Sequence, residues 1–245
     1  MKAVAVIQAR ISSTRLPCKA LLELAGRPMI VHVIERAKAI RGTDAVILAT
    51  GTGKENLPLV TIAEECGIKS FRGSEDNVLE RFFRAVENLD CGYIIRITGD
   101  NPLTDHVSAS EALEYSLQNL PDHCSVAGIP VGTGVEIISR TALERAFRES
   151  STPYHFEHVT PYIKEHPENF KIMQYVARLR NPFPELRLTV DTPEDFELMN
   201  KIYTALYRGA PLLLPNVIEF ISDHPYLEHI NRHIKQRPMT HSSHE

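Results

Sequence analysis

Residues 3–19 read AVAVIQARISSTRLPCK, an apolar run followed by a basic segment. The apolar run predicts a buried strand. Behind it, Arg10, Arg15 and Lys19 occur with no acidic residue before Glu23. In open α/β sheets, ligands bind at the carboxyl ends of the strands, where loop amides and basic side chains meet an anion. We therefore expect this loop to bind a polyphosphate; the alternative is that the basic side chains are only solvated.

The composition outside this loop indicates one globular domain. The 245 residues are 43% hydrophobic, which is ample for a packed core, and no linker-like break divides them. We expect one α/β domain over residues 1–235 and a polar, disordered tail over residues 236–245. The formal net charge of −4 argues against a protein that coats nucleic acid and against a polybasic membrane binder. The positive charge is local, which suits a small anionic ligand.

The cysteines and the N-terminal region indicate the compartment. The four cysteines are widely spread and form no C-x-x-C pair, so neither a disulfide framework nor a zinc ribbon is indicated. No signal peptide precedes the first predicted strand, and no apolar run approaches the roughly 20 residues that span a bilayer. We expect a cytoplasmic protein with reduced thiols that binds neither nucleic acid nor membrane.

Strand-like and helix-like segments alternate along much of the chain. Apolar runs predict further buried strands, at 44–50, 68–72, 93–98 and 171–177. Apolar residues at helical spacing between them predict helices, and this alternation predicts a three-layer, Rossmann-like α/β fold with a mostly parallel sheet. From residue 124 onward the alternation loosens. Amphipathic helices at 202–206 and 217–233 are expected to cover the sheet or a homodimer interface.

An acidic residue follows the predicted strand 93–98. Asp100 lies in the turn Gly99-Asp100-Asn101-Pro102-Leu103. A carboxylate just past the carboxyl end of a buried strand is placed to hold a metal ion over the sheet edge. The alternative is an ordinary turn aspartate before a proline. We interpret Asp100 as a metal ligand.

Residues 8–19 resemble the signature loop Q-A-R-x-x-S-T-R-L-P-x-K of the spore coat polysaccharide biosynthesis protein F family. This family is similar to the enzymes that activate sialic acid and 3-deoxy-manno-octulosonate, in the cytidylyltransferase superfamily. The resemblance implies a nucleotide-diphospho-sugar transferase-like fold. The loop departs from the usual pattern at Ser12 and Cys18, where members often have glycine. Glycine lets a backbone approach a phosphate closely or take a positive φ.

Further segments resemble the same family in the expected order, over roughly residues 3–222. Residues 73–81, GSEDNVLER, look like its base-binding loop and helix. The resemblance implies nucleotide contacts from the first loop, including Ala9, and from Gly73, Ser74, Glu75 and Asn77. Helix capping is the alternative explanation of these polar residues. Arg81 is the weaker candidate, and its alternative is a surface position on the helix.

Two acidic positions match the family's metal ligands. Residues 99–103 match its G-D-x-P-L turn, and residues 190–196, VDTPEDF, match a phrase whose first Asp is the second magnesium ligand. Residues 186–190 are expected to form a short strand before it. Helix capping by Thr192 and Pro193 explains much of that phrase but does not explain Asp191. The resemblance therefore implies that Asp100 and Asp191 hold Mg²⁺.

Two later segments resemble the acceptor half of the family's site. Residues 130–137, PVGTGVEI, resemble P-x-G-L-D-V-E-V, with Thr133 and Gly134 in place of Leu-Asp, and this implies acceptor binding by Glu136. Residues 157–163 match E-H-V-T-P-Y-I. His158 is expected either to bind an anionic substrate or to pack structurally. The spacing of His155 and His158 would suit zinc, but no third ligand is evident.

The enzyme that the resemblance implies is a Mg²⁺-dependent cytidylyltransferase of surface polysaccharide biosynthesis. Arg10, Arg15 and Lys19 would grip the triphosphate of CTP, and CMP would pass to a sugar acid while pyrophosphate leaves. The residues with catalytic roles would be Arg10, Lys19, Asp100 and Asp191. Positioning and electrostatics would then supply most of the rate.

Three alternatives remain open from the sequence. A nucleotide-sugar glycosyltransferase usually carries a D-x-D motif, and residues 99–102 contain only one acid. A pyrophosphorylase that uses another nucleoside triphosphate would share the fold, because base choice depends on loop amides. A non-catalytic nucleotide-binding protein would explain the departures at Ser12, Cys18 and Gly134.

Overall fold

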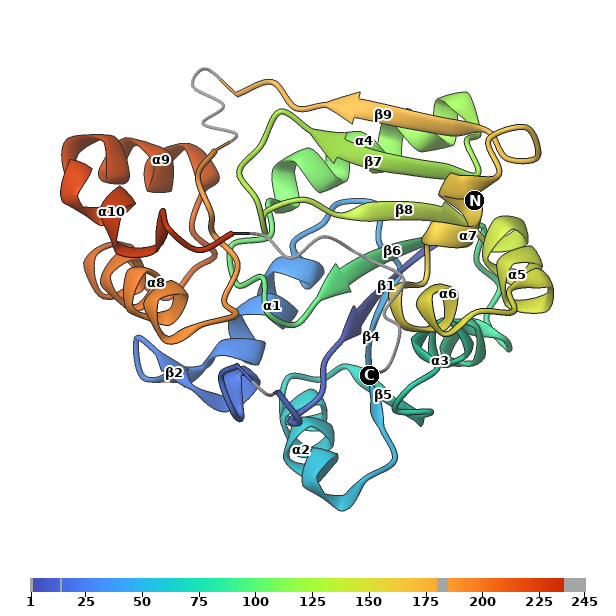
Figure 1. Cartoon of the computed structure of the whole chain (residues 1–245), viewed down its shortest axis with the longest axis horizontal. Helices are drawn as coiled ribbons and strands as arrows, with labels where there is room; N and C mark the ends of the chain where they lie inside the picture. The colour runs from blue at the N-terminus through green and yellow to red at the C-terminus, as the bar shows by residue number, and fades with distance from the viewer. Residues whose placement is uncertain (1, 14, 180–184, 236–245) are drawn as a thin grey trace.

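The apolar run near the start of the chain forms β1 (Ala3–Gln8), an interior strand of a seven-stranded sheet (Figure 1). It pairs in parallel with β4 (Ala45–Gly51) on one side and with β6 (Tyr93–Thr98) on the other. Every residue from Ala3 to Ile7 is buried, because both faces and both edges of this strand are covered. The first predicted strand is thus confirmed as a buried strand, and the strand predicted at 93–98 is the middle one of the seven.

The other strands complete the order β5-β4-β1-β6-β8-β7-β9. They are β5 (Lys69–Gly73), β7 (His123–Ala127), β8 (Glu136–Ser139) and β9 (Ile172–Val176). Within this sheet β8 runs antiparallel to both neighbours, and the other pairs are parallel. The predicted mostly parallel sheet is therefore confirmed. The structure is a computed structural model that describes residues 2–13, 15–179 and 185–235, so the tail expected at 236–245 lies outside it.

Helices cover both faces of the sheet, which gives the predicted three-layer α/β fold (Figure 1). One face packs against α1 (Met29–Lys38), α2 (Leu57–Glu65) and α4 (His106–Asn119). The other face packs against α3 (Val78–Val86), α5 (Arg140–Glu149), α6 (Pro153–His158) and α7 (Pro161–Glu165). Among the described residues, no helix has the length and apolar character needed to cross a membrane.

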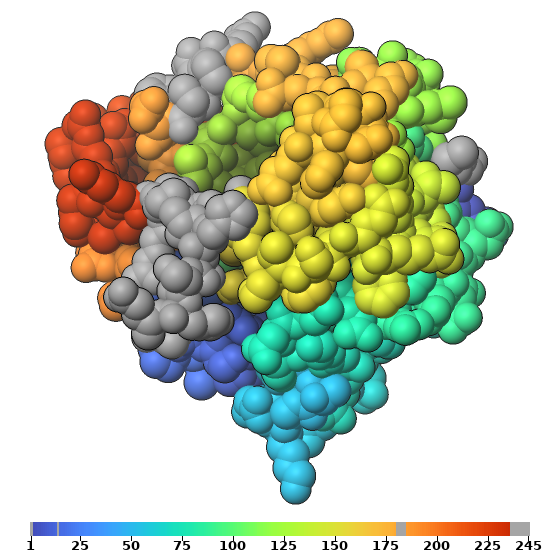
Figure 2. All heavy atoms as spheres, turned by 45° about the vertical axis from the view of Figure 1, so that its right-hand side comes forward, coloured from blue at the N-terminus to red at the C-terminus, as the bar shows by residue number. Residues whose placement is uncertain are grey.

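A third apolar core lies beside the sheet and is built around the C-terminal helices. These are α8 (Pro193–Leu206), α9 (Leu214–Asp223) and α10 (Glu228–Asn231). Figure 2 shows α9 and α10 in red, on the opposite side of the segment between β7 and β8 from α6 and α7 in yellow. The smaller elements are β2 (Glu23–Leu24), β3 (Arg27–Pro28) and the 3-10 turns η1 (Lys19–Leu21), η2 (Lys54–Asn56) and η3 (Pro225–Leu227).

Several elements differ from the sequence-based expectations. Residues 186–190 are not a strand: Arg187 makes one isolated bridge to Val131, and the segment is held by scattered backbone hydrogen bonds. The helix expected at 217–233 is broken near Pro225, whose ring cannot donate a backbone hydrogen bond. Neither β7 nor α5 was predicted from the sequence, because the periodic apolar pattern in these segments is short. Residues 202–206 end α8 and do not form a separate helix.

We expect the sheet and the C-terminal helices to unfold together, because buried Arg36 joins them. Arg36 of α1 is 1% exposed and donates hydrogen bonds to the carbonyl oxygens of Thr104 (2.9 Å) and Leu212 (2.8 Å). Arg36→Met would leave both acceptors unpaired and lower the free energy of unfolding by about 1–3 kcal/mol in urea titrations. Arg148→Met on the exposed face of α5 is the matched control, with an expected effect within about 0.5 kcal/mol. Equal effects of the two substitutions would contradict this role.

Candidate active site

The ammonium group of Lys19 joins three segments that lie far apart in the sequence. It donates hydrogen bonds to Asp100 Oδ2 (3.0 Å), Asp191 Oδ1 (2.8 Å) and the carbonyl oxygen of Val190 (2.9 Å). Asp100 follows β6 and Asp191 precedes α8, so both carboxylates lie at the carboxyl edge of the sheet. The structure thus brings together both predicted metal ligands and one predicted phosphate-binding residue.

Two more cations contact the same carboxylate of Asp191. Arg15 lies 2.9 Å from Asp191 Oδ1 and Arg187 lies 2.9 Å from Asp191 Oδ2. Burial raises the pKa of the Asp191 carboxyl, but the charges of Lys19 and Arg15 lower it by more, so it lies below its ordinary 3.8. Burial lowers the pKa of the Lys19 ammonium, but the two carboxylates raise it above 10.5. Asp191 and Lys19 therefore both carry their charges at neutral pH.

The backbone before Lys19 explains how this side chain reaches the carboxylates. Cys18 adopts a left-handed conformation (φ 55°, ψ 24°) and accepts a 2.8 Å hydrogen bond at its carbonyl oxygen from the amide of Leu21. Glycine favours this conformation and L-residues seldom adopt it. Cys18 therefore follows a glycine-type path without being glycine, and the departure noted in the sequence leaves the turn in place.

A glycine after β6 lets the first loop approach the turn that carries Asp100. A Cβ atom on Gly99 would lie 2.7 Å from the Cβ atom of Ala9 and 3.0 Å from the carbonyl oxygen of Gln8. The amide of Gly99 donates a 2.8 Å hydrogen bond to that same oxygen. Only a residue without a side chain fits this approach, so Gly99 sets the distance between the two loops.

A buried network of hydrogen bonds lies behind Asp191, and the sequence did not predict it. Asp195 accepts hydrogen bonds from the Asp191 amide (3.0 Å), from Arg187 Nε (2.9 Å) and from Asn231 Nδ2 (2.9 Å). It also completes a capping box with Thr192. The capping pattern was visible in the sequence, but the contact with Asn231 spans 36 residues and leaves no local signal. The network fixes the backbone from which Asp191 projects.

The loop after β5 is tied to the first loop by another buried residue that the sequence did not reveal. Asn56 accepts a hydrogen bond from the Ile11 amide (3.0 Å) and donates one to Glu75 Oε1 (2.8 Å). Asn56 is fully buried, and the Glu75 carboxylate packs over Gly51. Glu75 is thus turned inward between the loops that follow β1, β4 and β5.

The remaining predicted base-binding residues shape this loop. Ser74 accepts a hydrogen bond from the Asn77 amide (3.0 Å), and Asn77 caps α3 by accepting one from the Glu80 amide (2.9 Å). The capping explanation therefore holds for both side chains. A Cβ atom on Gly73 would lie 2.8 Å from the Phe71 ring, so the loop packs closely there.

The surface alternative for Arg81 is wrong. Arg81 is 2% exposed and donates a hydrogen bond to the carbonyl oxygen of Ser74 (2.5 Å). Burial lowers its pKa to about 10, and the charge of Arg10 acts in the same direction. Arg10 itself is exposed at the start of the first loop. The charges of Arg10 and Arg81 therefore interact across the first loop and the loop before α3.

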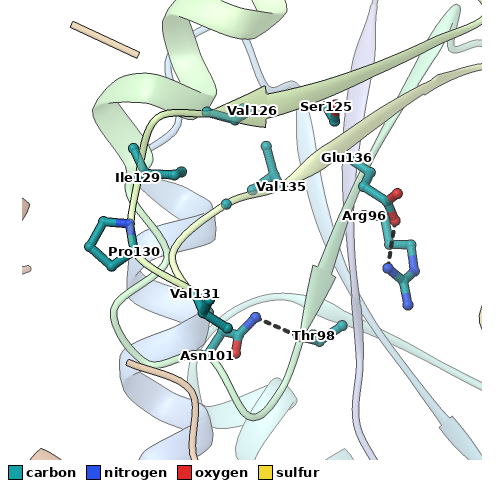
Figure 3. A pocket seen from close by; sticks show the side chains of 12 residues that line it. Arg96, Thr98, Asn101, Ser125, Val126, Ile129, Pro130, Val131, Val135 and Glu136 are labelled. Carbon is teal, nitrogen blue, oxygen red and sulfur yellow. Dashed lines mark hydrogen bonds and ion pairs between the residues drawn. The ribbon is translucent and has the colours of Figure 1, made fainter. Parts of the chain in front are cut away.

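The acceptor candidate Glu136 lies at a pocket of about 310 Å³ beside Asn101 (Figure 3). Its carboxylate contacts Arg96 (2.6 Å), His123 (3.1 Å), Thr160 (3.1 Å) and Lys164. Burial raises the pKa of Glu136, but the charge of Arg96, the His123 hydrogen bond and the charge of Lys164 lower it well below 4.5. Glu136 is therefore a charged, fully paired wall residue and is not free to act as a base.

His158 does not line this pocket. It is half-buried, its ring lies 5.2 Å from that of Tyr154, and burial lowers its pKa. The next residue, Val159, has a φ of 70°, and the Thr160 amide donates a 2.8 Å hydrogen bond to the His158 carbonyl oxygen. This strained turn aims Thr160 at Glu136. Substrate binding by His158 stays a prediction.

The two carboxylates fit a divalent cation. Asp100 and Asp191 offer hard oxygen donors, and the Lys19 ammonium already lies between them as a cation. In the described part of the chain, no group of three or more His, Cys, Asp or Glu side chains gathers to hold a metal. A metal ion here would therefore need further oxygen ligands from a bound molecule.

Comparisons with known proteins agree with this geometry. The model of a family described as cytidylyltransferase matches residues 4–236. The spore coat polysaccharide biosynthesis protein SpsF of Bacillus subtilis is 31% identical over 203 residues, which cover 81% of this chain and 85% of SpsF. A 3-deoxy-manno-octulosonate cytidylyltransferase of Chloroherpeton thalassium is 29% identical over 182 residues, 72% of each chain.

A solved structure shares the whole fold. The structure of a cytidylyltransferase from Leptospira borgpetersenii serovar Hardjo-bovis superposes with a TM-score of 0.86 and 28% identity. The match covers 93% of this chain and 96% of that one. The predicted nucleotidyltransferase-like fold is confirmed by this similarity.

Arg187→Met should be strongly destabilising, because it leaves the buried carboxylate of Asp195 without a guanidinium partner and removes one of the cations that contact Asp191. We expect a loss of about 3–5 kcal/mol in urea unfolding. Lys201→Met, which breaks an exposed ion pair on α8, is the matched control and should change little. Adding Asp195→Asn to Arg187→Met should recover part of the loss. A loss no larger than in the control would contradict the network.

The stability of the protein should depend on pH through Glu136. Because the folded pKa lies well below 4.5, its ion pairs stabilise the fold above pH 4.5, and this contribution is lost as pH falls through the folded value. The gap in unfolding free energy between wild type and Glu136→Gln should therefore shrink between pH 6 and about pH 3. Other carboxylates titrate equally in both proteins. A difference in unfolding free energy that stays constant between pH 6 and about pH 3 would contradict the lowered pKa of Glu136.

Proposed function

This chain belongs to the cytidylyltransferase family, and on that premise we propose that it transfers CMP from CTP to a sugar acid during glycan biosynthesis. The observation that carries the proposal is the cluster in which Lys19 joins Asp100 and Asp191 at the carboxyl edge of the sheet. The relatives named for spore coat polysaccharide biosynthesis and for 3-deoxy-manno-octulosonate support the class of acceptor. The reaction belongs in the cytoplasm, where CTP is available.

In the proposed reaction, a hydroxyl oxygen of the acceptor attacks the α-phosphorus of CTP. A new phosphorus–oxygen bond forms, and the bond from that phosphorus to the α,β-bridging oxygen breaks. Pyrophosphate leaves with the bonding electrons, and the hydroxyl proton passes to solvent. Arg10, Arg15 and Lys19 hold the triphosphate and offset the charge on the leaving pyrophosphate. No covalent enzyme intermediate is needed.

Asp100 and Asp191 are the residues that would hold Mg²⁺. The ion, when bound, supplies positive charge at the reacting phosphate. Lys19 contacts both carboxylates, so its ammonium group would turn toward the phosphates if Asp100 and Asp191 held a metal ion. The same side chain then serves two anions in turn: the carboxylate pair before binding and the triphosphate after it.

The loop after β5 is proposed to read the base. The backbone of residues 73–75 borders the first loop through Asn56 and Glu75, so a nucleotide held by Arg10 and Arg15 would place its base nearby. Base choice would depend on these backbone groups and on Glu75, because the side chains of Ser74 and Asn77 are used in capping.

The proposal is tested by Mg²⁺-dependent pyrophosphate release with CTP, UTP, GTP, ATP and dTTP against a panel of sugar acids. Release with CTP and one acceptor, in preference to the other nucleotides, is the expected result. Tight CTP binding without turnover on any acceptor would favour the non-catalytic alternative. Equal use of UTP or dTTP would instead indicate a different pyrophosphorylase.

Asp100→Ala and Asp191→Ala should each abolish turnover, because each removes one of the two carboxylates proposed to hold the metal ion. Circular dichroism should show a retained fold for Asp100→Ala, whose side chain is partly exposed. Wild-type rates of turnover in both variants would show that Asp100 and Asp191 do not hold the metal ion.

Lys19→Met should bind Mn²⁺ at least about 10-fold more tightly than wild type in the absence of CTP, because it leaves the carboxylate pair without its ammonium partner. Electron paramagnetic resonance of free Mn²⁺ measures this directly and does not depend on activity. Lys164→Met, which removes a lysine from Glu136, is the matched control and should leave Mn²⁺ binding unchanged. Equal Mn²⁺ binding by wild type and Lys19→Met would contradict the exchange of Lys19 for a metal ion.

A further inference from the structure

A single buried side chain joins the loops that follow β1, β4 and β5. Asn56 lies in η2, between β4 and α2, and is fully buried. Its side-chain oxygen accepts a hydrogen bond from the Ile11 amide (3.0 Å), and its side-chain nitrogen donates one to Glu75 Oε1 (2.8 Å). Ile11 directly follows Arg10, which is proposed to grip the triphosphate. Asn56 therefore sets the distance between the first loop and the loop after β5.

The turn that carries Asn56 is itself fixed. The Asn56 backbone amide donates a 3.1 Å hydrogen bond to the Gly53 carbonyl oxygen, which closes η2. The next residue begins α2, and this helix packs on β4 and β5. Asn56 therefore projects from a rigid support, and it holds the two loops relative to the sheet as well as to each other.

The loop after β5 is packed from two sides. A Cβ atom on Gly51 would overlap the Glu75 carboxylate, so this side chain lies directly on the end of β4. Within the described residues, Glu75 Oε2 is buried and has no partner, so the bond from Asn56 is the main hydrogen bond of the carboxylate. On the other side, Arg81 donates to the Ser74 carbonyl oxygen (2.5 Å). Moving this loop outward would break a charge-assisted hydrogen bond and leave buried polar groups unpaired.

A fixed distance between these loops limits the size of the base. In the proposed complex, Arg10 holds a phosphate and the backbone of residues 73–75 meets the base, so the nucleotide spans the gap that Asn56 sets. A purine has two fused rings and reaches further from the ribose than a pyrimidine does. A purine would therefore fit only if the loop after β5 moved outward and Glu75 parted from Asn56.

We propose that Asn56 is a positioning residue that makes the site select pyrimidine over purine nucleotides. This inference rests on the proposed function and identifies what sets the size of the base within it. Asparagine suits this place because one short side chain offers both an acceptor and a donor. Aspartate would still accept from the Ile11 amide, but it would turn a second carboxylate toward Glu75. The change Asn56→Asp therefore separates the two loops without releasing the first one.

The test measures binding of CTP, UTP, ATP and GTP by isothermal titration calorimetry, with Mg²⁺ and without an acceptor. Wild type should bind the two purine nucleotides about 10- to 100-fold more weakly than CTP, because a purine breaks one hydrogen bond to a charged group. In Asn56→Asp this purine penalty should fall below about 3-fold, because the bond is already lost in the free protein. The ratio of CTP to UTP affinity should not change, since the two bases have the same size.

Three further proteins complete the comparison. Asn56→Asp combined with Glu75→Gln restores a hydrogen bond between the two side chains, now donated by the glutamine amide, and should restore the purine penalty. Glu75→Ala removes the bond from its other end and leaves Asn56 bound to Ile11, so the purine penalty should be lost there too. Asn216→Asp makes the same change at an exposed position of α9. This matched control should bind all four nucleotides as wild type does.

Inorganic tripolyphosphate has no base, so it reports on the first loop alone. Its affinity should be the same in wild type, Asn56→Asp and Glu75→Ala, because the basic side chains of the first loop are unchanged. A purely structural role for Asn56 would instead weaken the binding of tripolyphosphate and of all four nucleotides together. That result would overturn the inference.

The outcomes separate this inference from the proposed function. A purine penalty that is lost in Asn56→Asp and returns in the double variant, without pyrophosphate release on any acceptor, would support the role of Asn56 and sink cytidylyl transfer. Pyrophosphate release with CTP, but a purine penalty that persists in both Asn56→Asp and Glu75→Ala, would support transfer and overturn the role of Asn56. A wild type that binds ATP and GTP as tightly as CTP would also overturn it.

Discussion

The arrangement of this site depends on a single ammonium group placed between two carboxylates. Asp100 and Asp191 would repel each other at this separation, and the Lys19 side chain makes their approach favourable. Because the three residues come from the first loop, the turn after β6 and the segment before α8, the same contacts hold the C-terminal helices against the sheet. The contacts of Lys19 with Asp100 and Asp191 therefore both shape the site and hold the C-terminal helices in place.

The charge balance of this cluster explains the order in which its ligands are suited to bind. Arg15, Lys19 and Arg187 face the carboxylates of Asp100, Asp191 and Asp195, so the charges within the cluster balance. Lys19 and Arg15 at the carboxylate pair oppose a free divalent cation, and a triphosphate would offer these two side chains another anion.

The sequence allowed the fold class to be predicted, because buried parallel strands leave continuous apolar runs, and it assigned Lys19, Asp100 and Asp191 to one site. It did not predict that Lys19 contacts both carboxylates directly. Contacts between distant residues left no such trace. Asn56 is one polar residue in a short turn, and only the structure shows that it joins the loops after β1 and β5. Arg81 lies at a helical position that exposes or buries a side chain depending on tertiary packing. The segment 186–190 is extended and apolar, but it lacks a neighbouring strand to pair with.

We propose that the cluster serves the transfer of CMP. The distribution of a phosphorus-32 label between the two products tests this most directly. CTP labelled with phosphorus-32 at the α-phosphate or at the γ-phosphate is incubated with the protein, Mg²⁺ and an accepted sugar acid, and the products are separated. Because CMP carries the α-phosphate, we expect the α-label in the sugar product and the γ-label in pyrophosphate. Transfer of the γ-label to the sugar would show a phosphotransferase and would contradict the account.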